Sequence, residues 1–149
     1  MIHEGGCVED LMPRFYNRTK RKLESPALTM ITQFLHAAIP VSNLEKSAYF
    51  YGTVLGLPTG ERNLKFSGLW YEVGDMQIHL IEVPSVISDL QNEAKWGRNR
   101  HLAFSVSDIE WAKEQLMGHG YEFQMSASGR AALFVKDPDG HVIELGVVG

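Results

Sequence analysis

The chain of 149 residues contains little cysteine, no excess of positive charge and no long apolar run. Cys7 is the only cysteine, which excludes an internal disulfide and favours a reducing compartment, so we expect a cytoplasmic protein. A formal net charge of −4 argues against a nucleic acid or an anionic membrane as the partner. No apolar run approaches the roughly 20 residues that would cross a bilayer, so no membrane association is predicted.

The N-terminal segment, positions 1–30, differs from the rest of the chain. It has little hydrophobic periodicity, mixed charges and prolines at positions 13 and 26, and it lacks the apolar core of a signal peptide. This composition predicts a flexible or partner-docked extension over residues 1–30. Residues 31–149 are long enough to form one folded domain with a substantial core.

The chain does contain an internal repeat, which decides how the rest is interpreted. HAAIPVSNLE begins at His36, and the similar HLAFSVSDIE begins at His101. The offset that superposes His36 on His101 also places VGDMQIHL (73–80) over PDGHVIEL (138–145), so that His79 falls on Glu144. Because both ends of the repeat match without a gap, we predict two copies of one structural unit, the modules 31–84 and 98–149.

Each copy is predicted to have the order β-α-β-β-β. Short alternating runs at 34–39 and 101–106 indicate the first strands. Ser42-x-x-Glu45 and Ser107-x-x-Glu110 match the capping box that begins a helix, and glycines at 56 and 120 are typical of helix ends. The remaining predicted strands are 57–63, 68–73 and 76–83 in the first copy, and 121–126, 131–136 and 141–147 in the second.

The predicted helices and strands each have one apolar face. Alternation along a strand separates two faces, and a helix shows one face at spacings of three and four residues. On the helices these residues are Leu44, Ala48, Tyr51 and Leu55, and then Ile109, Ala112 and Leu116. On the strands they are Leu35, Ala37, Ile39, Ile78, Leu80, Leu102, Phe104, Val106, Ile143, Leu145 and Val147. We expect the strand set to pack beneath the two helices.

The opposite face of the strands carries four side chains that can bind a metal. His36 and His79 come from the first copy, His101 and Glu144 from the second, and the spacing is the same within each pair. If a pseudo-twofold axis relates the copies, all four converge near it. Three imidazoles and a carboxylate suit a divalent ion, whereas burying them unpaired would be costly. A lone strand histidine is more often structural, so the duplication carries this prediction.

Other residues are weaker candidates. Trp70 could line the same pocket, although packing in the core explains it equally well. The arginines Arg98, Arg100 and Arg130 could bind an anionic substrate, although solvated loop charges are the simpler interpretation. His3, His119 and His141 lie in the extension, at a helix end and in a turn, so they are not predicted as ligands.

Four stretches resemble the vicinal oxygen chelate superfamily, also called the glyoxalase/bleomycin resistance protein/dioxygenase superfamily, and especially its short glyoxalase-like members. They are FLHAAIPVSNLEKSAYFYGTVLGLP, WYEVGDMQIHLIE, RHLAFSVSD and FVKDPDGHVIEL. The resemblance implies an α+β fold in which two βαβββ modules form a curved eight-stranded mixed sheet, a half-open barrel with the helices on its outer face. It also implies a homodimer, and one divalent ion (nickel, zinc, cobalt, manganese or iron) bound by His36, His79, His101 and Glu144.

The resemblance also implies a choice of activities on a small molecule. A glyoxalase I-type lyase or isomerase would act on a vicinally oxygenated substrate through a metal-stabilised enediolate, with Glu144 as the catalytic base. The alternatives are a non-haem Fe(II) ring-cleaving dioxygenase, using His36, His101 and Glu144, and an antibiotic-binding or resistance protein. Glyoxalase I usually has an arginine where this chain has Pro40, which counts against glutathione as part of the substrate.

Overall fold

The computed structural model describes residues 29–63 and 65–149. The extension predicted for residues 1–30 therefore falls almost wholly outside the described part of the chain. Contacts group Leu35–Gly149 into one compact unit. Within the described ranges, no helix is both long enough and apolar enough to cross a membrane.

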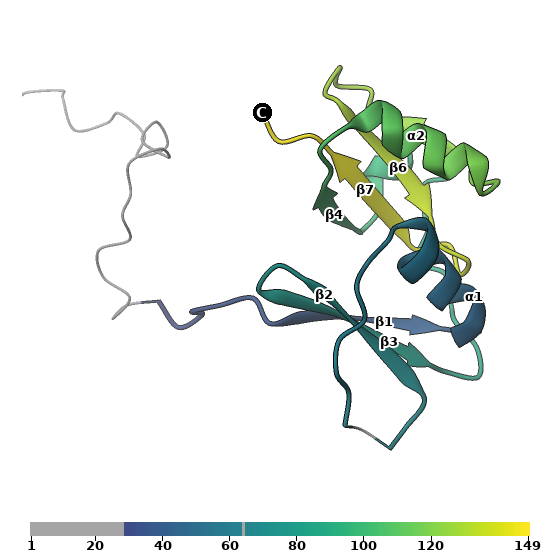
Figure 1. Cartoon of the computed structure of the whole chain (residues 1–149). Coiled ribbons are helices and arrows are strands. Elements are labelled where there is room, and N and C mark those ends of the chain that lie inside the picture. The colour runs from purple at the N-terminus through teal and green to yellow at the C-terminus, as the bar shows by residue number, and fades with distance from the viewer. Residues whose placement is uncertain (1–28, 64) are drawn as a thin grey trace, which may run out of the picture. The chain divides into compact units, whose positions relative to one another are not determined.

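The elements fall into two modules, each with a helix and its own sheet (Figure 1). The first module contains β1 (His36–Val41), α1 (Leu44–Ala48), the π-helix η3 (Tyr49–Val54), β2 (Gly68–Val73) and β3 (Met76–Glu82). The second contains the 3-10 helix η4 (Trp96–Arg98), β4 (His101–Ser105), α2 (Ile109–Gly118), β5 (Phe123–Met125), β6 (Ala132–Lys136) and β7 (Val142–Gly146). The strand orders are β1-β3-β2 and β4-β7-β6-β5.

The strand register repeats the sequence repeat. β1 lies parallel to β3 and pairs Ala38 with His79, while β4 lies parallel to β7 and pairs Ala103 with Glu144. The two pairs are related by the same offset that superposes His36 on His101 in the sequence. The two copies of the sequence repeat therefore have the same strand pairing. The candidate ligands consequently occupy equivalent positions in the two sheets.

One predicted strand does not form, and the single eight-stranded sheet is not confirmed. Between residues 57 and 63 only Thr59 forms a bridge, to Tyr71, although two further backbone hydrogen bonds connect this segment to β2. Pro58 has no amide hydrogen to donate and Gly60 has no side chain to pack, and both weaken a strand. The described residues therefore form seven strands in two sheets.

The helix caps differ from the predicted capping boxes by one residue. Asn43 Oδ1 accepts a hydrogen bond from the amide of Lys46, and Asp108 Oδ1 accepts from the amides of Glu110 and Trp111. Ser42 binds Asp139 of the second module instead of capping α1. Serine, asparagine and aspartate are all good caps, so the sequence alone does not separate neighbouring candidates.

The first helix also differs from the prediction because it widens into η3. A π-helix has a longer repeat than an α-helix, which changes the side chains that face the core. The face predicted from Leu44, Ala48, Tyr51 and Leu55 is therefore only partly correct. The buried residues are Ser47, Phe50, Tyr51 and Val54. In α2 the predicted face is confirmed, with Ala112 and Leu116 buried and Ile109 half-buried against the same core.

A single hydrophobic core extends through both modules. The predicted strand residues Ile39, Ile78, Leu80, Ile143 and Leu145 are all buried in it, and the helices contribute Phe50, Tyr51, Val54, Ala112 and Leu116. Leu35 and Val147 were also predicted to be buried, but their exposed fractions are 64% and 39%. Both lie just beyond the ends of the paired strands.

The two modules are joined by a buried hydrogen bond from the Tyr51 hydroxyl to Asp137 Oδ2, at 2.7 Å. Asp137 is only 5% exposed, and its Oδ1 accepts from the amides of Asp139 and His141. Burial raises the pKa of the Asp137 carboxyl, because desolvation outweighs the opposing hydrogen bonds and the charge of His141. Three hydrogen-bond donors thus stabilise the Asp137 carboxylate at the junction of the two modules.

Asp137→Asn should remove a pH dependence of stability. Because the folded-state pKa of Asp137 is raised, its ionisation weakens the native state as the pH rises from the ordinary value of 3.8 through the folded pKa. We expect urea unfolding over a pH series to show this decline in the parent protein and less of it in Asp137→Asn.

Tyr51→Phe should make the stability more dependent on pH, since it removes a hydrogen-bond donor that stabilises the Asp137 carboxylate. We expect a loss of about 1.5–3 kcal/mol at neutral pH, and a smaller loss at acidic pH where Asp137 is protonated. Tyr121→Phe is the matched control, because the Tyr121 hydroxyl has no hydrogen-bond partner among the described residues. Equal losses from the two tyrosine variants would contradict the role of the Tyr51–Asp137 bond.

Candidate functional site

The first pair of predicted ligands lies on the sheet of the first module. His36 of β1 and His79 of β3 stack with ring centroids 4.0 Å apart and an interplanar angle of 15°. Trp70 of β2 stacks on the other side of His79, at 4.2 Å and 10°. Trp70 was predicted to lie near the ligands, and here its ring contacts one of them. The three rings form a stack with His79 in the middle.

Gln77 determines which nitrogen of His79 carries the proton. Its side-chain nitrogen donates to Glu72 Oε1 at 2.8 Å, and a carboxylate can only accept. The amide oxygen of Gln77 must then be the atom that faces His79 Nε2, at 2.9 Å. His79 Nε2 therefore donates, which leaves the lone pair on Nδ1.

The surroundings of His79 keep its imidazole neutral. Burial is the largest cause that lowers the pKa of His79, and the nearby charges of His36 and Arg62 add to it, while Glu72 opposes. A neutral imidazole is the form that binds a metal, since a proton would occupy the coordinating lone pair.

The second pair lies on the sheet of the second module. His101 Nδ1 is 2.7 Å from the backbone oxygen of Asn99, and His101 Nε2 is 3.0 Å from Glu144 Oε2. A carbonyl oxygen can only accept, so His101 Nδ1 carries a proton and Nε2 faces the carboxylate. Glu144 is 8% exposed, and its other oxygen, Oε1, accepts from Arg130 Nη2 at 2.9 Å.

Asn99 also organises the loop that precedes β4. Its side-chain oxygen accepts from the amides of Gln91 and Asn92, and its side-chain nitrogen donates to the backbone oxygens of Asn92 and Trp96. Asn99 is 9% exposed. The same residue thus anchors the loop through its side chain and orients His101 through its carbonyl.

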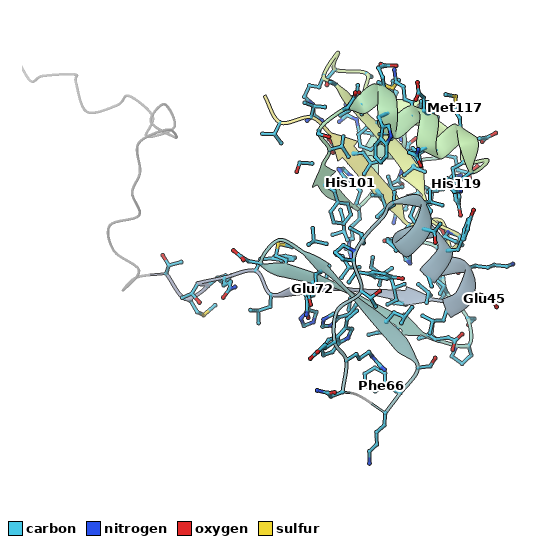
Figure 2. The ribbon with its side chains drawn as sticks, viewed as in Figure 1. Glu45, Phe66, Glu72, His101, Met117 and His119 are labelled. Atoms are coloured by element: carbon cyan, nitrogen blue, oxygen red, sulfur yellow. The ribbon has the colours of Figure 1, made fainter. Side chains whose placement is uncertain are left out.

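The four predicted ligands form two pairs in one chain and do not meet at one point. Within the described ranges, no three His, Cys, Asp or Glu side chains lie close enough together to hold a metal. Glu72 lies with the first pair on one sheet and His101 lies on the other (Figure 2). Each module therefore carries one half of the predicted constellation, and a four-ligand site stays a prediction.

A basic hollow of about 690 Å³ lies beside the second pair. Its lining includes three cations, Lys95, Arg98 and Arg130, and two aromatic residues, Trp96 and Phe134. The Phe134 ring meets His101 edge-on at 5.4 Å between centroids, and Arg130 contacts Glu144. Neither member of the second pair lines the hollow itself, but two residues that line it contact them, Phe134 for His101 and Arg130 for Glu144. The predicted substrate-binding residues Arg98 and Arg130 both lie here.

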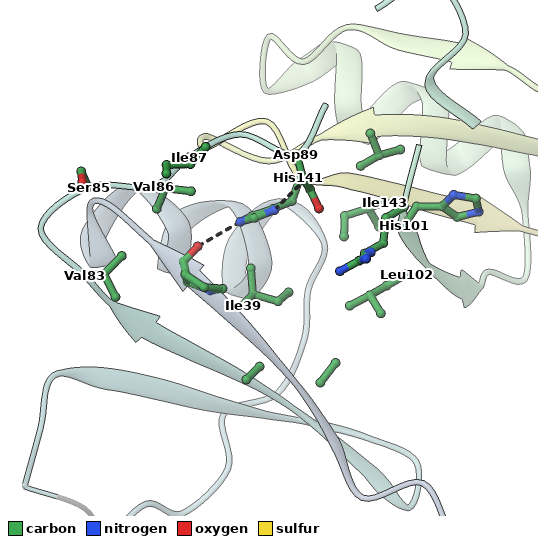
Figure 3. Close-up of a pocket in the computed structure, with 15 residues that line it drawn as sticks. Ile39, Val83, Ser85, Val86, Ile87, Asp89, His101, Leu102, His141 and Ile143 are labelled. Atoms are coloured by element: carbon green, nitrogen blue, oxygen red, sulfur yellow. Dashed lines mark hydrogen bonds and ion pairs between the residues drawn. The ribbon is translucent and has the colours of Figure 1, made fainter. Parts of the chain in front are cut away.

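Arg100, the remaining predicted substrate-binding arginine, lines a different cavity, which the predicted ligand His101 also lines. This cavity of about 580 Å³ lies between the modules and is lined mainly by apolar residues of β1, the segment 83–89 and the start of β7 (Figure 3). At its edge His141 Nε2 is 2.9 Å from the backbone oxygen of Pro40. His141, which was predicted as an ordinary turn residue, therefore links the two modules.

Comparison with known proteins establishes the family. The model of the Glyoxalase/Bleomycin resistance protein/Dioxygenase superfamily matches residues 33–145. The chain belongs to this superfamily. Its match covers both modules and all four predicted ligands, which confirms the resemblance that the sequence motifs indicated.

Relatives within the superfamily carry a common name. A "Probable lactoylglutathione lyase" of Synechocystis sp. is 29% identical, over 74% of this chain and 92% of the relative. A "Lactoylglutathione lyase" of Neisseria meningitidis serogroup A is 32% identical, over 75% and 88%. Among solved structures, a glyoxalase family protein of Enterococcus faecalis has a TM-score of 0.63 and 26% identity, covering 78% of this chain and 98% of that one.

Several residues that contact the predicted ligands or line the nearby cavities were not predicted from the sequence. Gln77 and Asn99 each precede a ligand by two residues, so their backbone positions lie next to His79 and His101 on extended chain. That spacing is a usable signal, because residues two apart on a strand share a face. The roles of Phe134 and His141 depend on contacts distant in the sequence, and no local pattern indicates them.

Gln77→Leu should change the tautomer of His79 without changing His101. In the metal-free parent we expect the neutral Nε2–H tautomer for His79 and a proton on Nδ1 of His101, measured by long-range proton–nitrogen NMR correlations. Removing the acceptor on Gln77 should leave His79 as a mixture of tautomers, while His101 serves as the internal control. A single Nδ1–H tautomer for His79 in the parent would show that Gln77 does not orient it.

Proposed function

We propose that this chain is a divalent-metal-dependent lyase or isomerase of the glyoxalase I type, acting on a small vicinally oxygenated molecule. The arrangement of His101 and Glu144 supports this most directly. The names of the lactoylglutathione lyases that resemble the chain support the reaction class. The substrate is left broader than lactoylglutathione, because Pro40 stands where an arginine is usual in glyoxalase I.

The residues present fit a metal. With its proton on Nδ1, a neutral His101 would point a lone pair at a carboxylate oxygen 3.0 Å away, which is repulsive unless a cation or a second proton lies between them. A divalent ion held by His101 Nε2 and Glu144 Oε2 would satisfy both groups.

We propose His36, His79, His101 and Glu144 as the ligands of one ion: nickel, zinc, cobalt, manganese or iron. The ion would act as a Lewis acid on two neighbouring oxygens of the substrate. The chain itself supplies the base: the Glu144 carboxylate accepts the proton next to the substrate carbonyl and returns it one carbon away. The rings of Trp70 and Phe134, which contact His79 and His101, would limit the access of water to the two pairs.

We further propose that two copies of the chain share each site. One chain holds its two pairs on separate sheets and not close together, which supports a site built from the pair of one module and the complementary pair of another copy. Proteins of this superfamily typically form dimers. A homodimer with crossed pairs would contain two complete sites.

Glu144→Ala should lose both metal and turnover. Because Glu144 is the only anionic ligand, we expect metal affinity to fall by roughly a hundredfold and turnover of the methylglyoxal–glutathione adduct, or of adducts with other thiols, to reach background. Elemental analysis of untagged protein and a calorimetric metal titration measure this. Glu110→Ala is the control, because Glu110 is an exposed glutamate on α2 whose side chain pairs, among the described residues, with Lys113 alone.

A parent that binds no metal after reconstitution would contradict the proposal and favour a small-molecule binding protein. Iron, together with oxygen consumption on catechols, would favour the dioxygenase.

Complementation tests the shared site. One variant carries His36→Ala and His79→Ala, and the other carries His101→Ala and Glu144→Ala. After unfolding and refolding together, mixed dimers should regain one metal site each if pairs cross between subunits. No recovery in the mixture, with mixed dimers verified by mass spectrometry, would assign each site to a single chain.

A further inference from the structure

The hollow beside the second pair differs in charge from the protein as a whole. The chain has a formal net charge of −4, yet the hollow is lined by Lys95, Arg98 and Arg130. None of the described residues that line it is acidic. Lys95 and Arg98 form no ion pair with any described residue. Their charges are therefore available to an anion in the hollow.

The other groups of the hollow also suit a small anion. Ser126 and Ser128 contribute hydroxyls, and Ser128 Oγ accepts from Arg130 Nε at 3.2 Å. The Gln124 side chain accepts from the amide of Trp96 and donates to the backbone oxygen of Ala94, which connects β5 to the segment 94–96 in the lining of the hollow. Guanidinium groups and hydroxyls together match the oxygens of a carboxylate or a phosphoryl group.

Arg130 forms a hydrogen bond with the Glu144 oxygen that the proposed base would use to accept a proton. Its Nη2 donates to Glu144 Oε1, whereas Oε2 faces His101. The Arg130 side chain already lines the hollow and is 63% exposed, while that of Glu144 is 11% exposed. Arg130 is therefore free to turn away from Glu144 toward the hollow, and Glu144 cannot follow. An anion in the hollow competes with Oε1 for the same guanidinium.

We propose that the hollow binds the anionic group of the substrate and that Arg130 then leaves Glu144, which frees Oε1 to accept the substrate proton. The substrate is thus a vicinally oxygenated molecule that also carries a carboxylate or a phosphoryl group. Arg130 is a positioning residue that blocks the base until such a substrate enters. The anion-binding part stands on the hollow alone, whereas the role of the freed oxygen rests on the proposed function.

Anion binding is tested on the metal-free protein, in the presence of a chelator, with inorganic phosphate and with malonate as probes. We expect saturable binding of at least one of them, weakened roughly tenfold or more by Arg98→Gln and by Arg130→Gln, since each removes a charged hydrogen-bond donor. Arg100→Gln is the matched control, because Arg100 lines the other cavity. The preferred probe distinguishes phosphoryl from carboxylate substrates, and equal binding by all variants would overturn the proposal.

The movement of Arg130 is tested on Glu144 directly. The carbon-13 signal of the Glu144 carboxyl should shift when the preferred anion is added to the parent, and should stay unchanged in Arg130→Gln. In anion-free buffer, Arg130→Gln should bind Ni²⁺ several-fold more tightly than the parent, because a cation beside the ligand is gone, whereas Arg98→Gln should bind it equally well.

The two proposals fail differently. Weaker Ni²⁺ binding in Arg130→Gln, or an unmoved Glu144 signal in the parent, would mean that Arg130 is a fixed support of the carboxylate and would overturn the exchange. If the parent binds no metal, the proposed function fails, while the phosphate and malonate titrations still decide whether the hollow is an anion site.

Discussion

The hydrogen bond between the Tyr51 hydroxyl and the buried carboxylate of Asp137 sets how the two modules are held. Burying a carboxylate is unfavourable unless donors surround it, and Asp137 has three. Two of those donors are amides of its own turn, so only Tyr51 reaches it from the first module. Ser42 bonded to Asp139 and His141 beside the carbonyl of Pro40 flank the same junction. The turn leads directly into β7, which carries Glu144, so the junction also positions the second ligand pair.

The two pairs of proposed ligands have equivalent backbone positions and different chemistry. In the first module two imidazoles stack under Trp70, and burial keeps His79 neutral. In the second module a carboxylate replaces the second imidazole, and it lies between His101 and Arg130. The first pair can therefore only donate lone pairs to an ion, whereas the second can also accept and release a proton. In the proposed site the duplication would supply the geometry, and Glu144, in place of a second histidine, would supply the acid–base group.

The features of the fold that both copies of the sequence repeat share could be predicted from the sequence. The offset between the two copies located both helices and both pairs of parallel strands, since a pattern seen in two copies is less ambiguous than either copy alone. The π-helix could not be predicted in this way, because it orients Tyr51 toward Asp137, which is distant in the sequence. Arg98 and Arg100 are two residues apart, yet they line different cavities because Arg98 belongs to a 3-10 turn. The spacing of two residues along the sequence therefore predicts a shared face only where the backbone is known to form a regular strand.

The location of the cations explains how an acidic chain can select an anion. At physiological ionic strength the Debye length is about 8 Å, so the net charge of the whole protein is screened before it acts on a distant ligand. Within the hollow, where Lys95, Arg98 and Arg130 lie around one small volume, the local charges dominate. Selection of an anion by these residues therefore acts on binding and orientation inside the hollow more than on the rate of encounter. Since Arg130 also touches Glu144, the same local field that holds the anion decides when the buried carboxylate is available.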